Sequence, residues 1–124
     1  MNYITKDSGK RQEFHTGAKR DTQDDKPRPD LFSPFALWRV GALLQRGAAK
    51  YDNRNWEKGM PISRFVASAH RHFTQWMMGD RSEDHLAAVI FNVQAIIHFE
   101  EIGRNDLNDM PSYTTDGVKN NLSR

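Results

Sequence analysis

The chain has 124 residues, of which 37% are hydrophobic and 27% charged, and its formal net charge at pH 7 is +2. This length fits one small domain, which buries a modest part of its surface, so association of several copies would help to stabilise it. The absence of cysteine excludes disulfides and thiolate metal sites. The balanced charge does not favour a nucleic-acid surface. No apolar run reaches the roughly 20 residues of a membrane helix, so we expect no membrane contact and a cytoplasmic protein.

The two ends of the chain are polar. Residues 1–30 show no helical period, and Pro27 and Pro29 disfavour helix in the residues before them. Residues 104–124 are similarly polar and contain helix breakers. The pattern therefore predicts an N-terminal arm over 1–30, a helical core over 31–103 and a C-terminal tail over 104–124.

Two helices are predicted in the first part of the core. Ser33 is a good N-cap and is followed by Pro34, which favours the first helical position. This helix is expected to end near Gly47. The second helix is expected after Ser63 and before Gly79, with apolar residues at helical spacing along one face.

A third helix is predicted with Ser82 as its N-cap and with Glu83 and Asp84 in its first turn, where the helix dipole favours negative charge. It is expected to continue to about Phe99 or Glu101 and is apolar on nearly every side, as in a helix buried in a bundle or between subunits. No strand pattern competes with these helices. The predicted fold is all-α, a small helical bundle built on an antiparallel helix pair and completed by oligomerisation.

Polar residues form a stripe on the second predicted helix, beside its apolar face. Arg64, Ser68, Arg71, His72 and Gln75 are spaced so that they lie on adjoining turns. The guanidinium groups of Arg64 and Arg71 can bind phosphate oxygens in pairs. The alternative is a solvated helix face with no ligand.

The third predicted helix carries His85 and Asn92 seven residues apart, with the small Ala88 between them. Polar groups in such an apolar helix must be hydrogen-bonded or coordinated, because burying them unpaired costs on the order of 1–3 kcal/mol each. Asn92 is therefore a candidate for ligand binding. A hydrogen-bonded network with a purely structural role would explain the same pattern.

Acidic residues flank the short turn between the second and third helices. Asp80, Glu83 and Asp84 lie near His72 and His85, which together predict a divalent-cation site. The predicted metal ligands are His72, Asp80, Asp84 and His85, and the predicted catalytic residues are Asp84, His85 and Glu83. Mg or Mn is the expected ion, and histidine ligation would favour Mn or another transition metal. Helix capping is the simpler role for the carboxylates.

The loop before the second helix combines rings, amides and lysines. Tyr51 and Trp56 can stack on a base, Asn55 can bind its edge, and Lys50 can bind phosphate. Lys19 in the arm can reach a phosphate in the same way. Rings, amides, arginines and a cation together point to a small-molecule nucleotide. The alternative for Trp56 is that it fills the core beneath the loop.

Several strings of the sequence resemble a known phage family, the dATP/dGTP diphosphohydrolase N-terminal domains, over roughly residues 16–113. They are Thr16-Gly17-Ala18-Lys19-Arg20-Asp21, Lys26-Pro27-Arg28, Arg54-Asn55-Trp56-Glu57-Lys58-Gly59, Ser63-Arg64-Phe65, Arg71-His72, Gly79-Asp80 and Glu83-Asp84-His85-Leu86-Ala87-Ala88. The resemblance implies an all-α fold, a phage source and a relation to MazG-like pyrophosphohydrolases, which use magnesium held by helix carboxylates. The EExxE motif of that group is absent, since Glu100-Glu101 lacks the spacing.

The favoured hypothesis is a metal-dependent diphosphohydrolase that converts purine dNTPs, dATP or dGTP, to the monophosphate and pyrophosphate in the cytoplasm of a phage-infected host. A rival hypothesis is a non-catalytic phage protein that sequesters a nucleotide signal of host immunity, an anti-defence function. A third, nucleic-acid binding, rests on scattered lysines and arginines alone and requires strongly salt-dependent binding.

Overall fold

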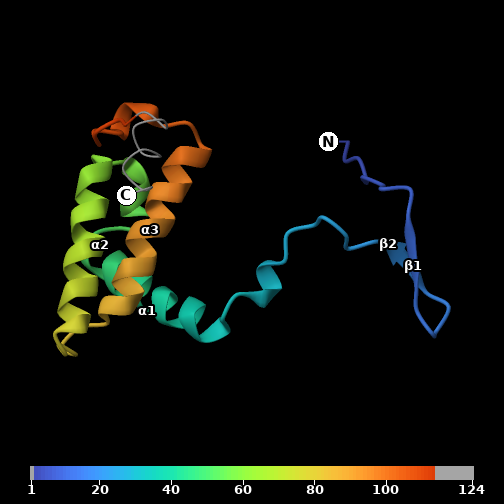
Figure 1. Cartoon of the computed structure of the whole chain (residues 1–124), viewed down its shortest axis with the longest axis horizontal. Helices are drawn as coiled ribbons and strands as arrows, with labels where there is room; N and C mark the ends of the chain where they lie inside the picture. The colour runs from blue at the N-terminus through green and yellow to red at the C-terminus, as the bar shows by residue number, and fades with distance from the viewer. Residues whose placement is uncertain (1, 114–124) are drawn as a thin grey trace, which may run out of the picture. The chain divides into compact units, whose positions relative to one another are not determined.

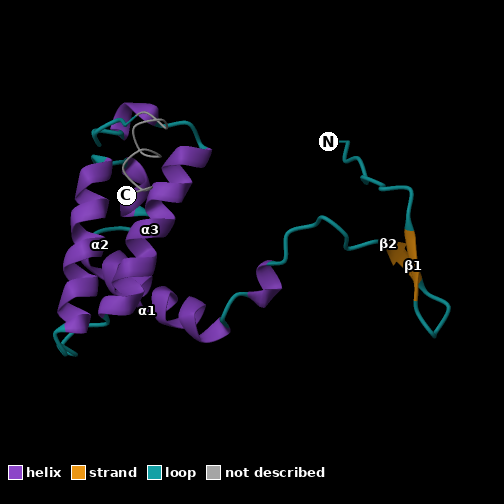
Figure 2. Cartoon of the chain, in the orientation of Figure 1, coloured by secondary structure: helices purple, strands orange, loops and turns teal. Residues whose placement is uncertain are grey.

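The computed structural model describes residues 2–113, and the chain divides into two units whose boundary lies between Phe32 and Ser33. Its elements are mostly helical (Figure 2). In chain order they are β1 (Arg11–Glu13), β2 (Lys19–Asp21), η1 (Pro29–Leu31), α1 (Pro34–Lys50), η2 (Asn55–Lys58), α2 (Ile62–Met77), α3 (His85–Glu101) and η3 (Asn105–Leu107). The tail expected over 104–124 lies partly outside the described residues.

The first unit contains an antiparallel β-hairpin, which the sequence analysis did not predict. Arg11 in β1 pairs with Asp21 in β2, and the turn is closed by a hydrogen bond from Phe14 N to Ala18 O of 2.8 Å. Gly17 in this turn has φ of 88°, a conformation that favours glycine. The strands have three residues each and are almost wholly exposed, so they carry no alternating apolar pattern that a sequence could show.

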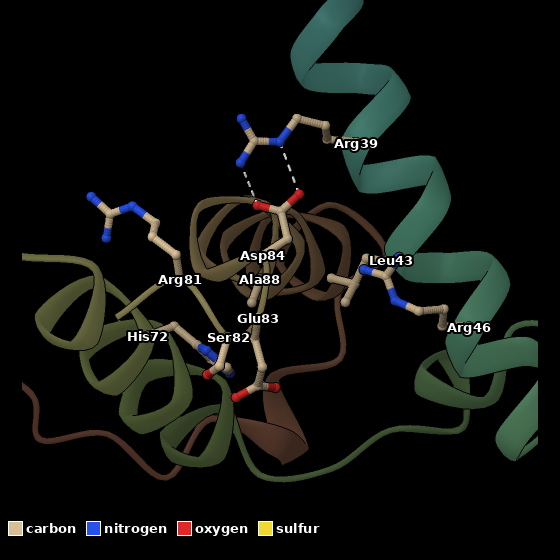
Figure 3. A pocket seen from close by; sticks show the side chains of 9 residues that line it. All are labelled: Arg39, Leu43, Arg46, His72, Arg81, Ser82, Glu83, Asp84 and Ala88. Atoms are coloured by element: carbon tan, nitrogen blue, oxygen red, sulfur yellow. Dashed lines mark hydrogen bonds and ion pairs between the residues drawn. The ribbon is translucent and has the colours of Figure 1, made fainter. Parts of the chain in front are cut away.

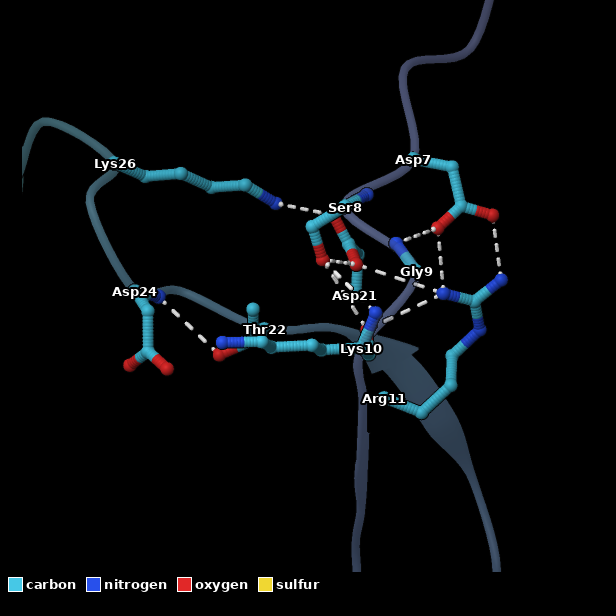
Figure 4. A network of polar contacts seen from close by, with 9 residues as sticks. All are labelled: Asp7, Ser8, Gly9, Lys10, Arg11, Asp21, Thr22, Asp24 and Lys26. Atoms are coloured by element: carbon cyan, nitrogen blue, oxygen red, sulfur yellow. Dashed lines mark hydrogen bonds and ion pairs between the residues drawn. The ribbon is translucent and has the colours of Figure 1, made fainter.

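Polar contacts hold this hairpin together (Figure 4). The carboxylate of Asp21 accepts hydrogen bonds from the backbone N–H and the hydroxyl of Ser8, and Lys26 Nζ lies 3.2 Å from it. Asp7 pairs with Arg11 at 2.6 Å. Exposed ion pairs of this kind contribute little to stability because solvent screens them, so these contacts give the hairpin little local stability.

Helix α1 begins as the sequence predicts. The side chain of Ser33 accepts a hydrogen bond of 3.2 Å from Ala36 N, and Pro34 takes the first helical position. The helix continues to Lys50, almost one turn beyond the expected end at Gly47. Gly47 does not end the helix, because its backbone stays helical and the next residues, Ala48 and Ala49, are strong helix formers.

Helices α2 and α3 pack side by side as an antiparallel pair, and α1 packs on α3 (Figure 1). Gly79 ends α2 with φ of 90°, and Asp80 N donates to Gln75 O at 3.1 Å to close the last turn. Helix α2 begins at Ile62, one residue before Ser63, after which it was expected to start. The tight turn brings the last residues of α2 next to the first residues of α3.

Helix α3 does not begin where the sequence predicts. Its N-cap is Asp84, whose carboxylate accepts a hydrogen bond of 3.2 Å from Ala87 N, and the expected cap Ser82 lies outside the helix. The backbone N–H of Ser82 instead donates to Asp80 Oδ1 at 2.9 Å, which fixes the turn. Glu83 is therefore exposed in the turn and lies outside α3, whereas it was expected in the first turn of that helix.

The core lies between α2 and α3. Phe65, Ile62, Ala95 and Phe99 are buried against one another, and Trp56 packs on this cluster from η2. The same paired helices carry the polar residues of the site at the opposite end, near the α2–α3 turn. Among the described residues, no helix is both long and apolar enough to cross a membrane.

Candidate functional site

A cavity of about 600 Å³ lies where α1 faces the turn between α2 and α3 (Figure 3). Its lining side chains come from all three helices and from the turn. They are Arg39, Leu43, Arg46, His72, Arg81, Ser82, Glu83, Asp84 and Ala88. The cavity is within the size range of small-molecule sites in proteins, and cationic and anionic groups share its walls.

A pair of histidines lies at the site: His72 lines the cavity and contacts His85, which is buried. Nδ1 of His72 lies 2.9 Å from Nδ1 of His85, and Nε2 of His85 lies 3.1 Å from Oδ2 of Asp80. His85 is buried, with 1% of its surface exposed, so this carboxylate determines its tautomer. Because a carboxylate can only accept a hydrogen bond, Nε2 of His85 carries the proton, and the lone pair of Nδ1 faces His72.

The histidine pair and Glu83 form a donor set that suits a metal ion. One ligand atom from each of His72, Glu83 and His85 lies within 4.8 Å of the other two. Ligand bonds to a transition metal are about 2.0–2.2 Å long, so the set needs only a small contraction to surround one ion. Glu83 is exposed and can supply that movement.

The charges around the histidines favour this arrangement. Burial lowers the pKa of His72 below its ordinary value of 6.5, and Glu83 acts in the opposite direction. A lowered pKa keeps His72 neutral at pH 7, the form that binds metal. Hydrogen bonds from the backbone and side chain of Ser82, with a further one from His85, lower the pKa of Asp80 to about 2. Asp80 is therefore an ionised carboxylate that accepts a hydrogen bond from Nε2 of His85.

Asp84 is engaged by two structural partners. Arg39 donates to both of its oxygens, with Nε to Oδ2 at 2.8 Å, and the same carboxylate caps α3 through Ala87 N. The hydrogen bonds from Arg39 are the main cause of the lowered pKa of Asp84. In this arrangement Asp84 orients the Arg39 guanidinium at the cavity wall.

A second cavity of about 470 Å³ is lined by α2 and α3. Its walls are Met60, Arg64, Phe65, Ala67, Ser68, Arg71, Phe91 and Asn92. Asn92 is 5% exposed, and its Nδ2 donates to Ala88 O at 2.8 Å and to Ser68 Oγ at 3.2 Å. Arg64, Arg71 and Asn92, which the sequence analysis grouped as ligand-binding residues, thus line one cavity.

Among protein families, residues 16–109 match the model described as dATP/dGTP diphosphohydrolase, N-terminal. This segment is most of the chain and includes every residue that lines either cavity. The chain belongs to the dATP/dGTP diphosphohydrolase N-terminal family. The resemblance noted in the sequence is thereby confirmed. No curated protein and no solved structure matched the chain.

The other residues that were predicted to bind a nucleotide do not line either cavity of this diphosphohydrolase-family chain. Trp56 packs on the core, with its ring centroid 4.9 Å from that of His98, and Asn55 precedes it in η2. Lys50 lies over the ring of Tyr51 at 5.2 Å, at the end of α1. Lys19 is in the hairpin, in the other unit of the chain.

Three arginines of the first cavity were missed by the sequence analysis. Arg39 and Arg46 lie seven residues apart in α1, with Leu43 between them, so they share a face of that helix. The same spacing argument that selected Arg64 and Arg71 in α2 would have found them. Arg81 is in the turn, where it donates to Trp76 O at 2.8 Å and to Asp80 O at 2.9 Å, and it carries no periodic signal.

Proposed function

We propose that this chain is a metal-dependent diphosphohydrolase that converts dATP or dGTP to the monophosphate and pyrophosphate in the cytoplasm of a phage-infected cell. The observation that carries the proposal is the grouping of His72, Glu83 and His85, with ligand atoms within 4.8 Å of one another. His72 and Glu83 line a cavity that Arg39 and Arg46 also line. Membership of the diphosphohydrolase family supports the reaction and the substrate class.

The residues of the triad fit a divalent cation by the chemistry of their donor atoms. His72, His85 and Glu83 would hold the ion through two imidazole nitrogens and one carboxylate oxygen. A set of two nitrogens and one oxygen suits Mn, Fe, Co or Zn better than Mg, which prefers oxygen ligands. When bound, such an ion polarises phosphate oxygens and lowers the pKa of a bound water.

The arginines of α1 would bind the triphosphate. The guanidinium of Arg39 is fixed by Asp84, while Arg46 makes no ion pair with any residue in the described part of the chain. Guanidinium groups bind phosphate oxygens in a bidentate manner. Arg46 therefore takes the free phosphate end in this proposal, and Asp84 acts by orienting Arg39.

In the proposed reaction, water attacks the α-phosphorus and the bond from that phosphorus to the α,β-bridging oxygen breaks. Pyrophosphate leaves with the bridging oxygen, and the water oxygen stays on the monophosphate. The water gives up a proton. The Glu83 carboxylate would hold the cation with one oxygen and accept this proton with the other. Glu83 is exposed at the cavity and, within residues 2–113, has no ion pair that would prevent this role.

The proposal is tested by incubating the full chain with each dNTP and with Mg or Mn, and resolving the products by anion-exchange chromatography. We expect dATP or dGTP to yield the monophosphate and pyrophosphate, and EDTA to stop the reaction. Glu83→Gln should remove turnover, whereas the control Glu101→Gln, exposed at the end of α3, should retain it. Turnover that persists in Glu83→Gln would contradict the assignment of the site.

A second candidate function is nucleotide sequestration without catalysis. It is favoured by the engagement of Asp84, which caps α3 and pairs with Arg39, and of Asp80, which accepts from Ser82 and His85. Carboxylates used in this way need no cation. Tight nucleotide binding with one ligand per site, unchanged by chelator and without product, would support this candidate over the enzyme.

We also propose that the chain functions as a homo-oligomer. Phe35 and Trp38 of α1 are 80% and 83% exposed, and Met77 of α2 and Ile97 of α3 are exposed as well. Apolar surface of this kind is typical of protein interfaces, and a second copy offers the same surface in return. Sedimentation velocity should show a dimer or larger species, and Trp38→Glu should shift it to the monomer. A wild-type monomer at high concentration would overturn this proposal.

A further inference from the structure

We infer that the cavity of about 470 Å³ between α2 and α3 is a subsite for the nucleoside part of the substrate. In this arrangement the triphosphate lies at the histidine pair and the base lies next to Asn92, away from the η2 loop. The inference rests on the proposed function for the position of the triphosphate. It adds the place and the chemistry of base recognition.

The first support is the side chain of Asn92, a buried amide with one unused end. Its Nδ2 faces the carbonyl oxygen of Ala88 at 2.8 Å, and because a carbonyl only accepts, the atom there must be the nitrogen. Asn92 lines the cavity, and the hydrogen bonds of its side chain to residues 2–113 all use Nδ2, so Oδ1 has no donor among these residues. A ligand that fills the cavity can satisfy this oxygen with an N–H or O–H donor. The 6-amino group of adenine and the N1–H and 2-amino groups of guanine all do so.

The second support is the composition of the walls. Met60, Phe65 and Phe91 give the cavity apolar surface, and Arg64 and Arg71 contribute planar cations at its edge. Aromatic rings and guanidinium planes are the groups on which proteins stack unpaired bases. Apolar walls with a few convergent polar groups are the usual make-up of a small-molecule site.

The third support is the position of this cavity along the paired helices. Ser68 precedes His72 by one turn of α2, and Asn92 follows Ala88 by one turn of α3. One helical turn is about 5.4 Å, so the nucleoside cavity lies one layer from the histidine pair on the same two helices. A deoxynucleotide can span this distance between its phosphates and its base.

The experiment follows backbone and side-chain amide signals of the full chain by NMR during titration with deoxyadenosine, deoxyguanosine or inorganic tripolyphosphate. We expect the nucleosides to shift the signals of Ser68, Phe91 and Asn92. Tripolyphosphate should shift those of Arg39 and Ser82 instead. Neither readout requires turnover, so nucleoside binding at Asn92 in a protein without hydrolase activity would reject the proposed function and keep the subsite.

A matched pair of variants tests the cavity itself. Ala67 is exposed and lines it, whereas Thr74 is exposed two turns further along the same face of α2 and lines neither cavity. Ala67→Phe should weaken nucleoside binding at least ~10-fold by filling the space, and Thr74→Phe should leave it unchanged. Shifts confined to Asn55 and Trp56, equal affinity in the two variants, or no nucleoside-induced shift at all would overturn the inference.

Discussion

Nδ1 of His72 and Nδ1 of His85 lie 2.9 Å apart, one on each side of the turn that joins α2 to α3. Two ring nitrogens at this distance can share a proton or, with a small adjustment, a cation. Asp80 keeps the proton of His85 on the opposite nitrogen, so Nδ1 of His85 has a lone pair that can accept a hydrogen bond from His72 or bind a cation. A carboxylate behind a ligating histidine is a common support of metal sites.

Replacing Asp80 should weaken metal binding without removing a ligand. Asp80→Asn removes the negative charge behind His85, and the loss of such a supporting partner typically costs about 10–100-fold in metal affinity. Isothermal titration with Mn²⁺ measures the effect. Asp106→Asn is the control, because Asp106 is an exposed carboxylate paired with Arg104 that lines neither cavity. Equal losses in the two variants would contradict a specific role for Asp80.

The stability of the fold should fall as the pH is lowered through 6.5. Burial lowers the pKa of His72 below its ordinary value of 6.5, so below that pH the unfolded chain binds more protons than the folded chain. The free energy of unfolding therefore falls as the pH is lowered from 6.5, and it levels off once the pH is below the pKa of His72 in the folded chain. Urea unfolding from about pH 7.5 to 5 should show this slope, and His72→Gln should flatten it. His70→Gln, a change at an exposed histidine of the same helix, should leave the slope unaltered.

The two structural roles of Asp84 can be separated by two substitutions. Asparagine is as good an N-cap as aspartate, so Asp84→Asn should lose the ion pair with Arg39 and keep the cap on Ala87 N. Asp84→Ala should lose both, at an additional cost of about 1 kcal/mol. Urea unfolding of the two variants measures the difference. Equal stability of the two would show that the cap does not contribute.

Truncation of Phe65 should destabilise the helical core strongly. Phe65 is 2% exposed and packs with Phe99 between α2 and α3, so Phe65→Ala leaves a cavity that costs about 3–5 kcal/mol. Tyr3→Ala, at an exposed position in the N-terminal unit, should change the free energy of unfolding by about 0.5 kcal/mol or less. A small loss for Phe65→Ala would place the core elsewhere.

The sequence predicts the helices well where local signals agree. Ser33 followed by Pro34 marks the start of α1, and the apolar run of α3 is correctly assigned to a helix. The predicted start of α3 is wrong. Ser82 and Asp84 are both good N-caps, so local criteria do not distinguish them. In the structure Asp84 caps α3 and also pairs with Arg39, a contact over 45 residues of chain that no local pattern can show.

The same limit applies to the candidate site. The need of His85 for a partner is predictable, because a polar residue in an apolar helix must be hydrogen-bonded or coordinated, and the structure brings it into contact with His72. The sequence cannot show that Asp80 supports His85 from behind, since that depends on the geometry of the turn after Gly79. Trp56 shows the opposite case: a ring in a polar loop suggested a base, while the structure packs it on the core.

The most direct measurement of the central claim is Mn²⁺ binding to the full chain, followed by electron paramagnetic resonance and by calorimetry. We expect one ion per chain, with the affinity strongly reduced in His72→Gln and in Glu83→Gln and retained in the control His70→Gln. A wild-type chain that binds no Mn²⁺, Co²⁺ or Zn²⁺, or binding that survives both His72→Gln and Glu83→Gln, would contradict a metal site at this turn.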